Sequence, residues 1–194
     1  MSNGVSRMKH PNFSAGFTLV ELVLTLAILA IITVYALPSM ERLVKKGRQH
    51  SSVSELIALI NLARNTAITE RVSVTLCPIT ANNKCGSDWT EPLVVFRDPL
   101  RTKTISDTDQ IIRILALPAS GSLQGNTGIR NYFRFRPTGL AKEAIGNIVW
   151  CPSDGDTRYA SQIRINMGGR PLISPDTDGD GIPNGANGLP ITCS

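Results

Sequence analysis

Histidine and charged side chains are scarce in this chain of 194 residues. Its only histidines are His10 and His50, and charged residues make up 18% of the sequence. A histidine base within residues 71–194 is therefore excluded, and no glycine-rich phosphate loop stands between a strand and a helix. No two cysteines have the Cys-x-x-Cys spacing of a zinc knuckle. These absences argue against an enzyme and against a four-cysteine zinc site.

One long apolar run, residues 17–38, dominates the N-terminal part and contains a single charged residue, Glu21. At about 20 residues it is long enough to span a bilayer as one helix. A secretory signal has a shorter apolar core that precedes its cleavage site, whereas here the small residue Gly16 precedes the run. The run would therefore stay in the mature chain. A carboxylate inside a membrane is expensive, which predicts a function for Glu21.

The junction at residues 16–22 resembles the signal for prepilin peptidase in type IV pilins and type II secretion pseudopilins. A short polar leader with Arg7 and Lys9 precedes it. The resemblance implies cleavage between Gly16 and Phe17 and N-methylation of Phe17. It also implies that Glu21 pairs with the methylated amine of a neighbouring subunit during assembly. The alternative is an ordinary anchor with one tolerated glutamate.

The pattern beyond the apolar run predicts that the helix continues as an amphipathic segment over residues 39–70. Pro38 should kink or locally break it, because proline lacks a backbone donor. Gly47 and the polar run to Ser54 should loosen it midway. An apolar stripe at helical spacing should lie against a sheet; its members are Leu43, Leu56, Ile57, Ile60, Ala63 and Ala67.

Short β-type runs follow, separated by glycine, proline, asparagine and aspartate. We expect strands at residues 72–76, 93–96, 111–115, 132–136, 148–150 and 163–165. Residues 99–109 and 118–128 are typical of loops. The expected fold is α+β and pilin-like: a leader (1–16), a transmembrane and assembly helix (17–38), its amphipathic continuation (39–70) and a β-rich head (71–194).

The head resembles the GspH/FimT family of minor pilins and pseudopilins. The matching segments are residues 74–78, Cys85, Trp89, residues 94–98, residues 133–139 and Gly169-Arg170. The resemblance implies a subunit in the inner membrane, with its head in the periplasm, that joins other minor and major pilins in the priming or tip complex of a type IV pilus. The cysteine-bearing loop after the first strand favours the FimT/FimU branch. A type II secretion pseudopilin H is the alternative.

Four cysteines, all beyond the apolar run, indicate two disulfides in an oxidising compartment. Four cysteines allow three pairings. We favour Cys77 with Cys85, and Cys151 with Cys193, because each bond would close a loop with little apolar content.

Alternate acidic residues in the tail, Asp176, Asp178 and Asp180, are followed by glycine and then by Asn184. This fragment resembles calcium loops of the thrombospondin type 3 kind, in which a tight turn aims several oxygens at a hard cation. It lacks the distal glutamate of an EF-hand. The sequence thus suggests a Ca²⁺ site with these four residues as ligands, or else an ordinary Asp/Gly turn.

Arginines gather between residues 128 and 170. On a strand, Arg134 and Arg136 would share one face, while Phe133 and Phe135 would be buried on the other. Such a stripe could bind DNA phosphates without sequence preference, or it could be a solvated face. The DNA-contact candidates are Arg130, Arg134, Arg136, Arg164 and Arg170. Some FimT members are linked to DNA uptake through a Gly-Arg-x-basic motif, from which this chain departs at Pro171 and Leu172.

Overall fold

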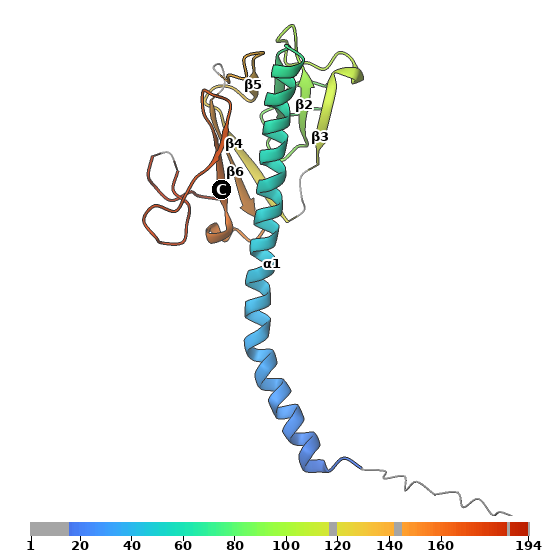
Figure 1. Ribbon diagram of the computed structural model, residues 1–194, viewed down its shortest axis with the longest axis vertical. Helices are drawn as coiled ribbons and strands as arrows, with labels where there is room; N and C mark the ends of the chain where they lie inside the picture. Colours follow the sequence, from blue (N-terminus) through green and yellow to red (C-terminus); the bar gives the residue numbers. More distant parts are fainter. Residues whose placement is uncertain (1–15, 117–119, 142–144, 186, 194) are drawn as a thin grey trace, which may run out of the picture. The chain divides into compact units, whose positions relative to one another are not determined.

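The computed structural model describes residues 16–116, 120–141, 145–185 and 187–193. This part of the chain contains one α-helix, α1 (Leu19–Thr69), and two antiparallel four-stranded sheets (Figure 1). The described residues up to Arg42 form one structural unit, and those from Leu43 form a second, which contains the rest of α1 and the β-rich head. The expected leader residues Arg7, Lys9 and His10 lie outside the described residues. The α+β fold expected from the sequence is confirmed.

Helix α1 is continuous, and in its first half large apolar side chains are exposed on all sides, from Leu19 at 78% to Val34 at 68%. The expected local break at Pro38 is absent, because a proline removes only one backbone donor and the neighbouring hydrogen bonds still hold the helix. Gly47 does not interrupt the helix either.

The head half of α1 stays helical through its polar run because that run contacts the head. Lys45 lies 2.7 Å from the Asp154 carboxylate, and Gln49 donates to the carbonyl of Ala160 at 3.0 Å. An apolar stripe follows on the same helix. Its buried members are Val53, Leu56, Leu59, Ile60, Ala63 and Ala67. Leu43 was expected in this stripe but is 66% exposed, because it lies well before Val53, the first buried residue of the helix.

Each sheet is antiparallel throughout. The first has the order β3-β2-β1-β5 and the second the order β4-β6-β7-β8. The strands of the first are β1 (Val74–Pro78), β2 (Leu93–Arg97), β3 (Ile111–Leu115) and β5 (Phe133–Phe135). Those of the second are β4 (Gly121–Asn126), β6 (Gly146–Pro152), β7 (Ser161–Ile165) and β8 (Pro171–Ile173). Two short 3₁₀ turns, η1 (Thr108–Gln110) and η2 (Thr157–Tyr159), complete the described elements.

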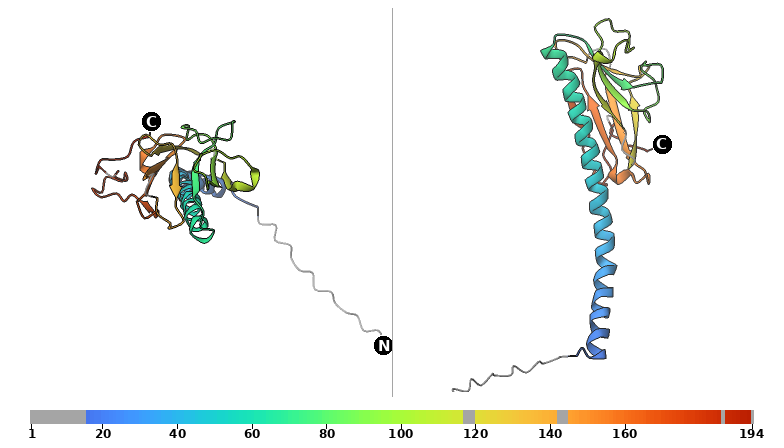
Figure 2. Two further views of the ribbon diagram at one scale, coloured as in Figure 1. Left: turned by 90° about the horizontal axis from the view of Figure 1, so that it is seen from above. Right: turned by 90° about the vertical axis from the view of Figure 1, so that its right-hand side faces the viewer.

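The main core lies between the stripe of α1 and the inner faces of both sheets, which the views of Figure 2 show on the same side of the helix. Its largest side chains are Trp89, Phe133, Phe135 and Trp150, and the rings of Trp89 and Phe133 meet edge to face at 5.9 Å. Two smaller clusters lie on the opposite faces of the sheets. One surrounds Cys77 and the other surrounds Cys151. Central strands are therefore buried on both faces, which explains their continuous apolar sequences.

Two strands depart from the sequence prediction. Residues 118–128 were expected to be a loop, yet β4 occupies Gly121–Asn126. Its glycines hide the strand pattern, but the packing requires them. A Cβ on Gly125 would lie 1.9 Å from Cε2 of Trp89, and one on Gly121 would lie 2.8 Å from Cε2 of Trp150. Strand β8 was also missed, because it begins with Pro171 at the edge of its sheet, where a missing amide is tolerated.

Candidate functional site

The expected processing and docking residues lie at the start of α1. Gly16 and Phe17 precede the helix, and Phe17 is 80% exposed. Thr18 caps the helix, since its Oγ1 accepts a hydrogen bond from the Glu21 amide at 3.2 Å. Glu21 lies in the first turn with its side chain exposed. Within the described part of the chain its carboxylate forms no ion pair.

Helix α1 is long and apolar enough to cross a membrane, and it is the one such helix in the described part of the chain. None of its most apolar segment is buried. In water, an apolar surface of this length would favour association or insertion into lipid. The helix therefore offers an anchoring and assembly surface that begins at Glu21.

The expected arginine stripe does not form a solvent-facing patch. Arg134 is only 5% exposed, and its Nη2 lies 3.0 Å from an Asp98 oxygen. Its strand pairs with β1, which sets Arg134 opposite Thr75 on a face covered by the loop after β2. The prediction that Arg134 contacts DNA is therefore wrong. Arg136 and Arg164 are half-buried. The remaining candidates are both exposed, but Arg130 lies in the loop between β4 and β5 and Arg170 lies in the loop between β7 and β8.

The acidic loop brings its three aspartates together. Carboxylate oxygens of Asp176, Asp178 and Asp180 lie within 4.8 Å of one another, and all three side chains are exposed. Hydrogen bonds from the amides of Gly179 and Gly181 lower the pKa of Asp176 below its usual 3.8. The three carboxylates form a donor set of the kind that hard cations prefer.

Asn184, the fourth expected calcium ligand, has a different role in the described loop. Its side chain is buried, and its Oδ1 accepts from both the amide and the hydroxyl of Thr177. Its Nδ2 donates to Asp178 at 3.2 Å and to the Gly188 carbonyl at 3.3 Å. Asn184 therefore holds the loop closed. Its side-chain oxygen is already bonded to Thr177 and is not free to serve as a fourth cation ligand beside the three carboxylates.

Both favoured disulfides are present in the structure. Cys77–Cys85 closes the loop after β1, and Cys151–Cys193 joins the end of β6 to the tail. Among the described residues no cysteine is free, which also removes the zinc alternative.

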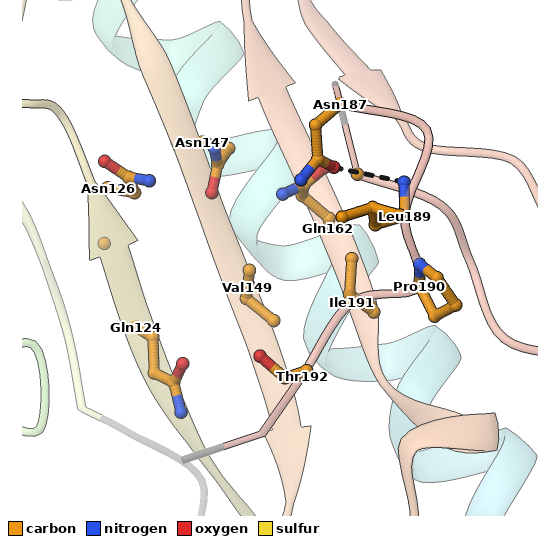
Figure 3. A pocket seen from close by; sticks show the side chains of 12 residues that line it. Gln124, Asn126, Asn147, Val149, Gln162, Asn187, Leu189, Pro190, Ile191 and Thr192 are labelled. Atoms are coloured by element: carbon orange, nitrogen blue, oxygen red, sulfur yellow. Dashed lines mark hydrogen bonds between the residues drawn. The ribbon is translucent and has the colours of Figure 1, made fainter.

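A cavity of about 340 Å³ lies between the outer face of the second sheet and the tail, and the sequence analysis missed it (Figure 3). Five carboxamide side chains line it. They are Gln124, Asn126, Asn147, Gln162 and Asn187. Gln124 and Asn126 are two residues apart on β4, as Asn147 and Val149 are on β6, so each pair faces the same side of its strand. This alternation of amides could have been found from the sequence, had β4 been recognised as a strand.

Comparisons with known proteins agree with the fold and the N-terminal motif. The family profile described as Type II transport protein GspH matches residues 52–169, and the profile described as Prokaryotic N-terminal methylation motif matches residues 11–37. Comparison with curated proteins gives no significant match.

Among solved structures, the chain is similar to the type IV minor pilin FimU of Pseudomonas aeruginosa PAO1. In its P21 crystal form the TM-score is 0.52 at 18% identity, and the match covers 66% of this chain and 90% of FimU. The P65 form gives a TM-score of 0.49 at 18% identity, with 65% and 92% covered. The P21 form supports the pilin fold of the described residues. Because the GspH profile spans more than half of the sequence, the chain belongs to the GspH family and carries the prokaryotic N-terminal methylation motif.

Proposed function

We propose that this chain is a minor pilin that assembles with other pilins in the priming or tip complex of a type IV pilus. Prepilin peptidase would cleave it between Gly16 and Phe17, and the new Phe17 amine would be methylated. The observation that carries the proposal is the uncovered apolar half of α1, which begins with Glu21 in its first turn.

Two partners in turn would cover that apolar surface. The inner membrane would hold the helix before assembly, with the head on the periplasmic side, since the span is long enough for one crossing. Neighbouring pilin helices would replace lipid after assembly. Glu21 would then pair with the methylated Phe17 amine of the neighbour, so that neither charge is left alone in an apolar environment.

A structural role fits the chemistry of the head better than catalysis. Pilins and pseudopilins are structural subunits, and this chain belongs to that class. The histidine in the described part of the chain is His50, exposed on α1, and the four cysteines are bonded to one another. Neither supplies a base or a nucleophile within the head.

Two systems use such subunits, and the alternative is a type II secretion pseudopilin, since the family is described as Type II transport protein GspH. We favour the pilus because the loop after β1 is closed by Cys77–Cys85, the feature that resembles the FimT/FimU branch. The deciding experiment removes the gene and restores it. We expect the deletion strain to lose its surface pili while protein secretion is unchanged. In the restored strain, the chain should form cross-links with other minor pilins. Normal piliation with a secretion defect would instead assign the chain to the secretion system.

A further inference from the structure

The cavity beneath the tail has an unusual chemical character. None of the twelve described residues that line it is charged, and five of them carry carboxamides. Each carboxamide offers an NH₂ donor and a carbonyl acceptor. A ligand that both donates and accepts hydrogen bonds at several points suits such a lining. An ionic ligand would find no opposite charge there.

One of these amides is left with an unused donor. Gln162 is 6% exposed, and its Oε1 accepts from the Ser174 hydroxyl at 2.8 Å. Its NH₂ group has no acceptor among the described residues. Because this NH₂ group is not fully enclosed by the protein, it can donate a hydrogen bond to a ligand oxygen in the cavity. Figure 3 shows the Gln162 carboxamide beside that of Asn187 at the upper end of the cavity.

Apolar groups complete the lining. Val149 of β6 and Ile191 of the tail are its buried apolar residues, and Leu189 and Pro190 of the tail also line it. Sugar rings present the same combination of surfaces, with hydroxyls around the edge and C–H groups on the faces. The volume of about 340 Å³ falls at the lower end of the range for small-molecule sites. It suits one or two sugar rings.

The walls of the cavity are held in place before any ligand binds. The Ile191 amide donates to the Pro183 carbonyl at 3.0 Å, and the Gly185 amide donates to the Leu189 carbonyl at 2.7 Å. Asn187 accepts from the Leu189 amide at 3.2 Å. The bond between Cys151 and Cys193 fixes the end of the tail to β6. Such preorganisation reduces the entropy lost on binding.

The position of the cavity favours a saccharide over a peptide. Extended peptides bind by adding to a free sheet edge through main-chain hydrogen bonds. This cavity lies over the face of the sheet, where side chains of β4, β6 and β7 line it, and the main chain of β6 is already paired with β4 and β7. Strand β4 is at the edge of the sheet, but a peptide added to that edge would lie in the plane of the sheet and not over its face. Side-chain amides are thus the polar groups that this face offers. We propose that the cavity is a binding site for a neutral mono- or disaccharide unit of a glycan, a role independent of the assembly function.

The test uses the full-length chain, purified in a detergent without a sugar headgroup. The probes are glucose, galactose, N-acetylglucosamine and the disaccharides cellobiose and N,N′-diacetylchitobiose. Binding is measured by saturation-transfer NMR and by shifts of the side-chain NH₂ signals in ¹⁵N-labelled protein. Asn147→Leu keeps the side-chain size and removes both polar groups from the cavity. Asn131→Leu makes the same change at an exposed asparagine outside it.

We expect saturable binding of at least one probe, with shifts at the NH₂ groups of Asn126, Asn147 and Gln162. Asn147→Leu should weaken binding about tenfold, because a sugar hydroxyl loses its partner in a desolvated site, and Asn131→Leu should leave it unchanged. If Asn147→Leu does not fold, the NH₂ signal shifts of the wild-type protein decide whether the sugar binds in the cavity. An uncharged pentapeptide is tested in the same way for comparison. Absence of binding by every sugar, binding that moves signals only outside the cavity, or shifts produced by the pentapeptide and by none of the sugars would each overturn the proposal.

Discussion

The Arg134 guanidinium donates to the Asp98 carboxylate across 3.0 Å inside the head, and Asp98 in turn fixes the loop that follows β2. Asp98 also accepts hydrogen bonds from the amides of Thr102 and Lys103 and from the Thr75 hydroxyl. The pair therefore joins strands β1, β2 and β5 to a surface loop. Its role is structural, although the sequence pattern had assigned Arg134 to a solvent-facing patch.

Removing the arginine should destabilise the head strongly. We expect Arg134→Met to lower the free energy of unfolding by about 3–5 kcal/mol, because the Asp98 charge would remain buried without its partner. Arg158→Met is the matched control, since Arg158 pairs with Asp156 but is 68% exposed, and its loss should change stability by about 1 kcal/mol or less. Urea denaturation followed by circular dichroism measures both. Equal effects of the two changes would contradict the buried-pair assignment.

Processing is the most direct prediction for the N-terminus. Mass spectrometry of the mature chain should find Phe17 as the first residue, carrying one added methyl group. Replacing Gly16 with a bulky leucine should leave the leader attached, because the junction would no longer offer a small residue. A mature chain that retains its leader, or one cut after residue 38, would refute the pilin assignment.

The docking role of Glu21 predicts an assembly defect without an insertion defect. Glu21→Gln keeps the shape of the side chain and removes the charge that should pair with a neighbour's amine. Membrane fractionation should find this variant inserted normally, while its recovery in sheared pili should fall severalfold. Thr25→Ala, one turn further along α1, should assemble like the wild type. Wild-type recovery of Glu21→Gln in pili would show that Glu21 has no part in docking.

The calcium hypothesis for the acidic loop stays a prediction. A ligand that binds only the folded state stabilises it by about 2.7 kcal/mol at a hundred times its Kd. The melting temperature should therefore rise with Ca²⁺ and fall again on chelation. Changing Asp176, Asp178 and Asp180 together to asparagine should abolish this response, whereas the exposed Asp109→Asn should retain it. A melting temperature insensitive to Ca²⁺ would identify the motif as an ordinary turn.

Acid should weaken the contact between the end of α1 and β2. Hydrogen bonds from Arg97 hold the pKa of Glu70 below its usual 4.5. A lowered folded-state pKa contributes stability above the unfolded value, and that stability is lost as the pH falls through the folded value. Between about pH 5 and pH 3, the melting temperature of Glu70→Gln should therefore fall less steeply than that of the wild type. Both partners are more than a third exposed, so the effect should be small. The exposed Glu91→Gln serves as control.

The sequence predicted features that depend on local pattern. The apolar length of α1, the helical spacing around Ile60 and the continuous apolar runs of β1 and β2 all have short-range causes. The favoured pairing of the four cysteines was also correct, although the segment between Cys151 and Cys193 contains β7, whose Ile163 and Ile165 belong to the main core.

Features set by distant contacts could not be predicted in the same way. The alternation at Phe133, Arg134 and Phe135 correctly placed the aromatic side chains in the core. It could not show that the loop after β2 covers the opposite face. Strand β4 could not be recognised from its sequence because Gly125 is required by the close packing of Trp89, a residue from another part of the chain. The amide cavity was missed with it, since two of its five carboxamides lie on that strand.

The bond between Cys151 and Cys193 has a consequence for export. It spans 42 positions, and β7, β8 and the acidic loop lie between its ends. In an exported head, the bond cannot close until all of these elements have entered the oxidising compartment. A disulfide between Cys151 and Cys193 would therefore mark a molecule whose chain has entered that compartment at least as far as Cys193.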